Sequence, residues 1–191
     1  MARRRPGRGA FLSLSILAAV AAGCTEPARG WDRSSGSADA APVESNIVGV
    51  RKFISSNPWL IFNSDGTGRV DGLKVMLYLE GTKEPKGVFG TGTIVVTLYR
   101  VDQDPAGGRV ARQVFEREFP PDKAYPWRRK RATGMGWGYG LRLPWGKDLD
   151  LSGQNILIVV KYVQENGRVV ASAPQELLVP EAKYHALKIE P

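Results

Sequence analysis

Side chains that could perform enzyme chemistry are few in this chain of 191 residues. A Ser-His-Asp or Cys-His site needs a histidine as general base, and the only histidine, His185, stands near the end of the chain. The sequence has no G-x-S-x-G motif and no His/Cys cluster that could hold zinc. Glycosidases work with paired acids instead, for which the candidates are Glu116, Glu118, Asp122, Asp148 and Asp150. We therefore expect a protein that is not an enzyme and has no cofactor, with a carboxylate-dependent hydrolase as the enzymatic alternative.

The stretch NSDGTGRVDG, residues 63–72, has the look of a cation-binding loop. Oxygen-bearing side chains stand at three alternate positions before Gly68, namely Asn63, Asp65 and Thr67. A calcium loop of this kind requires a bidentate Glu at its twelfth position, where this sequence has Lys74. We interpret the stretch as a glycine-rich connection with Asx turns and expect no metal site. An ion shared by Asp65 and Asp71 is the alternative.

The stretch GMGWGYGLRLPWG, residues 134–146, alternates large side chains with glycines. Successive side chains of a strand point to opposite faces, so the large ones share a face: Met135, Trp137, Tyr139, Leu141, Leu143 and Trp145. We interpret this face as part of a core, with the glycines on the outer face, where another group can approach the backbone. In the alternative, Trp137 and Tyr139 are exposed as a platform for sugar rings, and the protein is a carbohydrate-binding module.

A cluster of cations follows Trp127 in the segment WRRKR, which contains Arg128, Arg129, Lys130 and Arg131. We interpret this segment as a solvated, charged turn between strands. The alternative is that Trp127 and the four cations contact an anionic partner, such as lipid headgroups, an acidic cell-wall polymer or an acidic envelope protein.

The N-terminus has the layout of a secretory signal peptide. Four arginines without an acid precede an uncharged run over residues 10–22, and small residues follow it. This run of 13 residues is shorter than the roughly 20 that a membrane-spanning helix needs. We predict that residues 1–23 are a signal peptide and that the protein is exported.

Residues 21–24, Ala-Ala-Gly-Cys, resemble the lipobox of bacterial lipoproteins, although Ala21 stands where that motif usually has Leu. The resemblance implies cleavage before Cys24, a diacylglyceryl thioether on its sulfur, and acylation (palmitate) of the new amino terminus. Cys24 is also the only cysteine, and a lone free thiol would be a liability in an oxidising compartment. We therefore predict a lipid anchor at Cys24. In some bacteria an Asp directly after the lipidated cysteine resembles a signal for retention in the inner membrane, and this chain has Thr25 at that position. We therefore expect the protein in the outer membrane, if the cell has one, facing the periplasm or the cell surface.

Removal of the signal peptide changes the charge of the protein. Its four arginines lower the formal net charge from +8 to +4 when they are lost, and four of the remaining cations lie in WRRKR. The rest of the mature chain is close to neutral, so we expect no nucleic-acid partner.

Composition divides the mature chain into three parts. Residues 24–46 are rich in Ser, Ala, Gly, Pro and charge, which predicts a lipidated cysteine with a disordered linker. Residues 47–180 contain short apolar runs separated by turn signals, including Asn166-Gly167, a strong hairpin signal. We predict one antiparallel β-sandwich of about seven strands, followed by a tail over residues 181–191.

Four segments carry a resemblance to a known family: NPWLIFNSDGTGRVDGLKVMLYLEG, KGVFGTGTIVVTLYRVD, PWRRKRATGMGWGYGLRLPW and LLVP. The chain resembles a family of uncharacterised lipoproteins from planctomycete bacteria, over nearly the whole mature domain. The resemblance implies an immunoglobulin-like sandwich and supplies no activity, cofactor or substrate. Our expectation is a lipid-anchored, non-catalytic module that has a structural or interaction role in the cell envelope.

Overall fold

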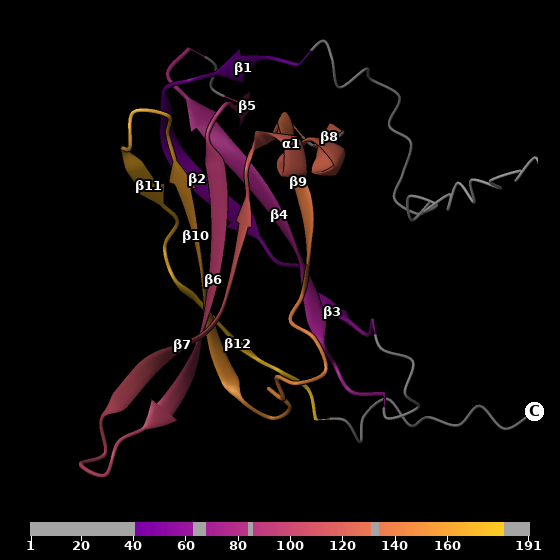
Figure 1. Ribbon diagram of the computed structural model, residues 1–191, viewed down its shortest axis with the longest axis vertical. Helices are drawn as coiled ribbons and strands as arrows, with labels where there is room; N and C mark the ends of the chain where they lie inside the picture. Colours follow the sequence, from indigo (N-terminus) through magenta and orange to yellow (C-terminus); the bar gives the residue numbers. More distant parts are fainter. Residues whose placement is uncertain (1–40, 63–67, 84–85, 131–133, 182–191) are drawn as a thin grey trace, which may run out of the picture. The chain divides into compact units, whose positions relative to one another are not determined.

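The computed structural model describes residues 41–62, 68–83, 86–130 and 134–181. These residues form two β-sheets (Figure 1). The two sheets share one hydrophobic core. The predicted all-β sandwich is confirmed. The described residues contain twelve strands instead of about seven, because several strands are only two to four residues long.

The first sheet has seven strands built around β4 (Gly72–Gly81). Along one edge β4 pairs with β2 (Ile47–Phe53) and then β3 (Trp59–Leu60), and along the other with β5 (Gly87–Gly90) and β9 (Trp137–Pro144). Beyond these lie β1 (Val43–Glu44), which pairs with β5, and β8 (Arg128–Lys130), which pairs with β9. All these pairs are antiparallel except β1 with β5.

The second sheet has five strands, all antiparallel. Its central strand β10 (Asn155–Val163) pairs along one edge with β6 (Thr93–Gln103), which pairs in turn with β7 (Arg109–Phe119). Along its other edge β10 pairs with β11 (Val169–Ala171) and β12 (Gln175–Leu178). The predicted hairpin at Asn166-Gly167 joins β10 to β11, and Gly167 has the positive φ of +82° that such a turn requires.

Alternate residues of the long strands form the core, as the period of two in a strand requires. They are Leu73, Val75, Leu77 and Leu79 of β4, Ile94, Val96 and Leu98 of β6, and Ile156, Ile158, Val160 and Tyr162 of β10, all of them buried. Removing this much apolar surface from water is the main force that holds the two sheets together. A buried hydrogen bond also joins the two sheets. Gln164 Nε2, just after β10, donates to the carbonyl of Ile47 in β2 at 2.7 Å.

The domain begins earlier than the predicted boundary at residue 47. Val43 and Glu44 form β1, and Ala41 belongs to the core. Glu44 Oε2 accepts a hydrogen bond of 2.9 Å from the Thr82 backbone N–H, so this strand is fixed at both its backbone and its side chain. The linker prediction is therefore wrong for residues 41–46. Residues 1–40, and with them Cys24, lie outside the described residues, as does the predicted tail from residue 182 onward.

A short helical segment connects the two sheets between β7 and β8. It consists of α1 (Pro121–Ala124) and the 3₁₀ turn η2 (Tyr125–Trp127). Pro121 at the first helical position and Ala124 in the core fix this turn. In the part of the chain that the structure describes, no helix is long and apolar enough to span a membrane.

Candidate binding surface

The aromatic face of β9 points into the sandwich. Tyr139 is 1% exposed, and Leu141, Leu143 and Trp145 are buried beside it. The core interpretation is confirmed for these four residues. The ligand-platform alternative is wrong for Tyr139, because a ring enclosed by both sheets cannot meet a sugar.

Trp137 lies at the rim of the same face. Its ring is partly buried against the core, with its centroid 5.7 Å from that of Phe89 in an edge-on arrangement. On another side, Lys130 Nζ lies 5.1 Å from the Trp137 ring centroid. Trp137 thus retains a partly exposed edge, but Tyr139 is not beside it on the surface, so the pair offers no shared stacking surface.

Two buried tyrosines, one from each sheet, hold the turn between β5 and β6. The Gly90 N–H donates to Tyr139 Oη at 3.1 Å, and the Gly92 N–H donates to Tyr162 Oη at 2.6 Å. Burial raises the pKa of both phenols above the ordinary value. At Gly90 a Cβ would collide with the Tyr162 hydroxyl, which explains a glycine where the rings and the backbone approach so closely.

The basic cluster is not simply a solvated turn. Arg128, Arg129 and Lys130 form strand β8, and Arg128 is half-buried. Its guanidinium carbon lies 4.4 Å from the ring centroid of Phe89 and 4.8 Å from that of Tyr125. Arg129 and Lys130 are exposed, Trp127 packs partly against the core, and Arg131 lies outside the described residues.

Gly138 of β9 and Gly87 of β5 make room for Tyr78 on the outer side of the seven-stranded sheet. A Cβ on Gly138 would lie 2.9 Å from the Tyr78 ring, and one on Gly87 would meet the same ring at 2.9 Å. Tyr78 is consequently 5% exposed although it points away from the core. The group that approaches the β9 backbone is therefore a side chain of the protein itself.

The remaining outward positions of this sheet combine cations with apolar side chains. We call this surface the outer face, and its members are Arg51, Phe53, Phe62, Lys74, Met76, Glu80, Arg129 and Arg142. Its geometry follows from strand alternation: Lys74 and Met76 lie between the inward residues of β4, and Arg142 lies between Leu141 and Leu143. Sequence analysis singled out Arg129 but missed Lys74 and Arg142, which become neighbours only when β4 pairs with β9.

Of the two acids that could share an ion, Asp65 and Asp71, the structure describes Asp71. Its side chain is buried, and Oδ1 accepts a hydrogen bond of 2.6 Å from the Phe62 N–H. Asp65 lies outside the described residues. Asp71 therefore fixes the backbone of Phe62, whose ring lies against Gly72 on the outer face.

The acids considered for hydrolysis are distributed over separate elements. Glu116 and Glu118 lie on β7, Asp122 on α1, and Asp148 and Asp150 follow β9. Glu116 accepts a hydrogen bond of 3.0 Å from Thr97 Oγ1, and Asp150 Oδ1 accepts one of 3.0 Å from the Ser152 N–H. That hydrogen bond lowers the pKa of Asp150. Among the described residues, no three His, Cys, Asp or Glu side chains gather where they could hold a metal ion, and His185 is not among those residues.

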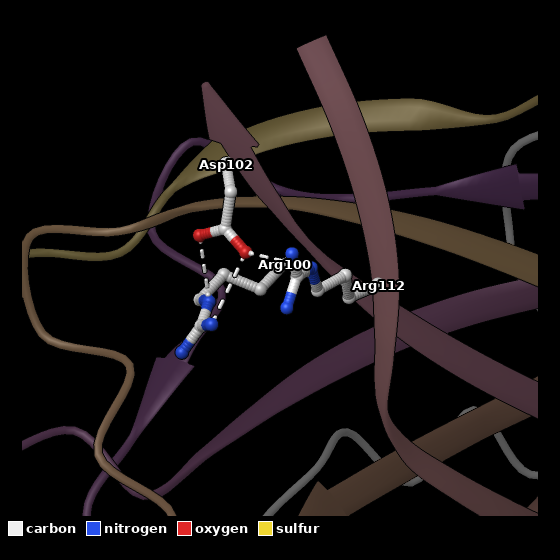
Figure 2. A network of polar contacts seen from close by, with 3 residues as sticks. All are labelled: Arg100, Asp102 and Arg112. Carbon is white, nitrogen blue, oxygen red and sulfur yellow. Dashed lines mark hydrogen bonds and ion pairs between the residues drawn. The ribbon is translucent and has the colours of Figure 1, made fainter. Parts of the chain in front are cut away.

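A polar network stiffens the hairpin of β6 and β7 (Figure 2). Asp102 accepts hydrogen bonds from Arg100 at Oδ1 and Oδ2, of 2.8 and 3.1 Å, and Arg112 Nε lies 3.7 Å from the same Oδ2. All three residues lie on paired strands, near the end where β6 extends beyond its partner β10. The network links the two strands at this end of the hairpin, and an ion pair of Arg109 with Glu176 also connects it to β12.

No family model matches the chain, and no curated protein matches it in sequence. A function is therefore inferred from the sequence motifs and the surface described above.

Proposed function

We propose that the protein is a lipid-anchored, non-catalytic module of the cell envelope with an interaction role. The observation that carries the proposal is the sequence Ala-Ala-Gly-Cys at residues 21–24, which ends a signal-like segment in the only cysteine of the chain. The fold supports it: a sandwich whose interior is filled by apolar side chains presents its chemistry on its surfaces. The immunoglobulin-like character of the sandwich and its likeness to planctomycete lipoproteins belong to the same proposal.

The sequence offers two candidate interaction surfaces, the aromatic face of residues 134–146 and the basic cluster WRRKR, and the structure does not support them equally. A carbohydrate platform made of Trp137 and Tyr139 would need both rings on the surface, whereas Tyr139 is buried. The outer face instead combines Arg129 of the basic cluster with Lys74 and Arg142. We infer that an anionic component of the envelope, at the outer membrane if the cell has one, is the partner of this module.

The anchor is tested by expressing the full chain and its Cys24→Ala variant in a lipoprotein-processing bacterium. We expect the parent to fractionate with membranes and to yield an N-terminal peptide that begins at Cys24 and carries acyl chains, each buried methylene contributing about 0.8 kcal/mol. The Cys24→Ala protein should lack the acyl chains. An acyl-free Cys24 in the parent, or turnover of a glycan or peptide substrate by the purified protein, would contradict the proposal.

A further inference from the structure

Strand β7 is the last strand of the five-stranded sheet and has a single neighbour there. It pairs with β6 from Arg109 to Phe119, and among the described residues no strand pairs with its other edge. In a strand that is paired on one side only, alternate backbone N–H and C=O groups point away from the sheet and can accept another strand. We call this side of the strand the free edge of β7.

The other outer strands that the structure describes are short or are joined to the opposite sheet. β1 and β3 have two residues, β8 and β11 three, and β12 four. β2 has seven, but hydrogen bonds of Gln164 Nε2 to the Ile47 carbonyl and of Lys52 Nζ to Ser172 Oγ tie it to the segments that follow β10 and β11. β7 has eleven residues and is therefore the longest of these edges at which a further strand could add.

The side chains of β7 leave this edge open. Its residues are exposed except Val114 and Phe115, which are half-buried, and Phe119, which is buried. The strand contains no proline, a residue that would remove an N–H donor from the edge. It carries charges instead, which commonly protect an edge against indiscriminate pairing. The arrangement of these charges therefore decides which strand can add.

A β-bulge at Val114 determines which side chains of β7 share a face. Leu98 and Tyr99 of β6 pair with Phe115 and Gln113, so Val114 stands between these two as an extra residue. An extra residue shifts the alternation of faces by one position. Residues on either side of the bulge that are an odd number of positions apart consequently point to the same side of the sheet.

The side of β7 that faces away from the core has a cation at one end and two acids at the other. They are Arg109, Glu116 and Glu118, and their partners on β6 alternate with the core residues of that strand. Two copies of β7 that run antiparallel would bring these opposite charges together, whereas parallel copies would bring like charges together, which is unfavourable. The charge order of β7 is thus complementary to that of its own antiparallel copy.

The two other cations of β7 point to the core side and do not disturb this order. The guanidinium carbon of Arg117 lies 5.4 Å from the ring centroid of Phe119. Arg112 Nε lies 3.7 Å from Asp102 Oδ2. Both cations therefore have interactions within their own chain.

The register of β7 also defines a centre for such a pairing. Gln113 pairs with Tyr99 of β6, and the partners of Arg109 and Glu118 on that strand, residues 103 and 95, are each four residues from Tyr99. The cation and the acid are therefore equally far from Gln113 along the strand. A two-fold axis at Gln113 places each of them opposite the other in the second copy.

We propose that the free edge of β7 pairs with the β7 strand of a second copy of this chain, antiparallel and about a two-fold axis at Gln113. Arg109 of each copy then lies opposite Glu118 of the other, and the two five-stranded sheets join. Arg109 also forms an ion pair with Glu176 of its own chain, and a guanidinium has enough N–H donors for both carboxylates. This inference goes beyond the proposed function and does not depend on the lipid anchor.

The test measures self-association of the full mature chain, residues 24–191, with Cys24→Ser, so that neither an acyl chain nor a disulfide links two copies. Analytical ultracentrifugation of this parent should show an equilibrium between monomer and dimer. Arg109→Glu and Glu118→Arg should each weaken the dimer about tenfold or more, because each variant places two like-charged pairs across the axis. Glu165→Arg makes the same change of charge at an exposed position between β10 and β11 and should dimerise as the parent does.

An equimolar mixture of the Arg109→Glu and Glu118→Arg proteins separates pairing from misfolding. In the mixed dimer every cation again faces an acid, so we expect the mixture to dimerise within about threefold of the parent. Damage to the fold of either variant would not be repaired by mixing. A parent that stays monomeric at every concentration, or a mixture that associates no better than its components, would overturn the proposal.

Hydrogen exchange distinguishes a second copy from a segment of the same chain. We expect amide exchange in peptides of β7 to slow as the protein concentration rises through the range of dimerisation, and exchange in peptides of β12 to stay constant. Protection of β7 that does not depend on concentration would mean that another part of the same chain, such as residues 182–191, covers the edge. That outcome would also overturn the proposal.

Discussion

Arg128 and Arg129 are adjacent cations with opposite environments. Strand alternation turns Arg128 toward the rings of Phe89 and Tyr125, while Arg129 points to the outer face. The planar guanidinium can stack on aromatic rings, which explains how a charged side chain is half-buried there. Arg128 Nε is buried without a hydrogen-bond partner in the structure, so the rings replace part of the solvation that the group loses.

The hydroxyl of Tyr162 gives the native state a defined pH dependence. Burial raises its pKa, as it does that of Tyr139, so the folded protein holds these protons more tightly than the unfolded chain. Their contribution to stability is complete below about pH 10, the ordinary tyrosine pKa, and is lost as the pH rises through the folded pKa. We expect the urea midpoint to fall above that pH, and to fall less steeply in Tyr162→Phe.

At neutral pH the same variant should be less stable than the parent by about 1–3 kcal/mol, because the buried Gly92 N–H loses its acceptor. Urea titrations between pH 7 and pH 11 measure both effects. Tyr99→Phe, at a partly exposed tyrosine of β6, is the control for the loss of a tyrosine hydroxyl and should have the urea midpoint of the parent at pH 7. Identical slopes for the parent and Tyr162→Phe would show that this phenol does not contribute to alkaline unfolding.

At the scale of the strands, Gly138 is the point where β9 meets the Tyr78 ring. A Cβ there would lie 2.5 Å from the Leu77 carbonyl oxygen and 2.9 Å from the ring. We expect Gly138→Ala to reduce the free energy of unfolding by about 1–3 kcal/mol or more, because the Leu77 backbone, paired within the sheet, cannot move away from the new Cβ. Gly134→Ala, where a Cβ meets nothing within 4 Å, should change it by less than about 0.5 kcal/mol. Equal urea midpoints for the two variants would contradict this role for Gly138.

The strands with a clear hydrophobic alternation or continuous apolar character could be predicted from the sequence. Of the short apolar runs within residues 47–180, those at residues 109–119 and 155–163 coincide with β7 and β10. Strands β5 and β8 were missed, since one is a short segment between glycines and the other consists of three cations, which have low strand propensity. The run over residues 168–179 divides into β11 and β12, a break that apolar content does not reveal.

The candidate surface was less accessible to sequence reasoning than the core. Strand alternation alone predicts that Lys74 and Arg142 point to the face of the sheet that is opposite to the inward leucines of their own strands. Their meeting depends on the pairing of β4 with β9, which joins segments far apart in the chain. In the same way, the burial of Arg128 depends on Phe89, a residue of the β5 strand that the sequence did not indicate.

At the scale of the whole domain, one core joins the two sheets, and this makes a prediction about cooperativity. Leu141 belongs to the seven-stranded sheet and Val160 to the five-stranded one, and both are fully buried in the same cluster. We expect Leu141→Ala to cost about 2–5 kcal/mol and Val160→Ala somewhat less. In each variant, far-ultraviolet circular dichroism and tryptophan fluorescence should report one coincident urea transition. If the sheets were independent, Val160→Ala would shift the transition of its own sheet and leave that of Trp145, which lies just beyond β9, unchanged. Val110→Ala, on the exposed surface of β7, is the control and should leave the urea midpoints of both signals unchanged. A fluorescence midpoint that does not move in Val160→Ala would refute a shared core.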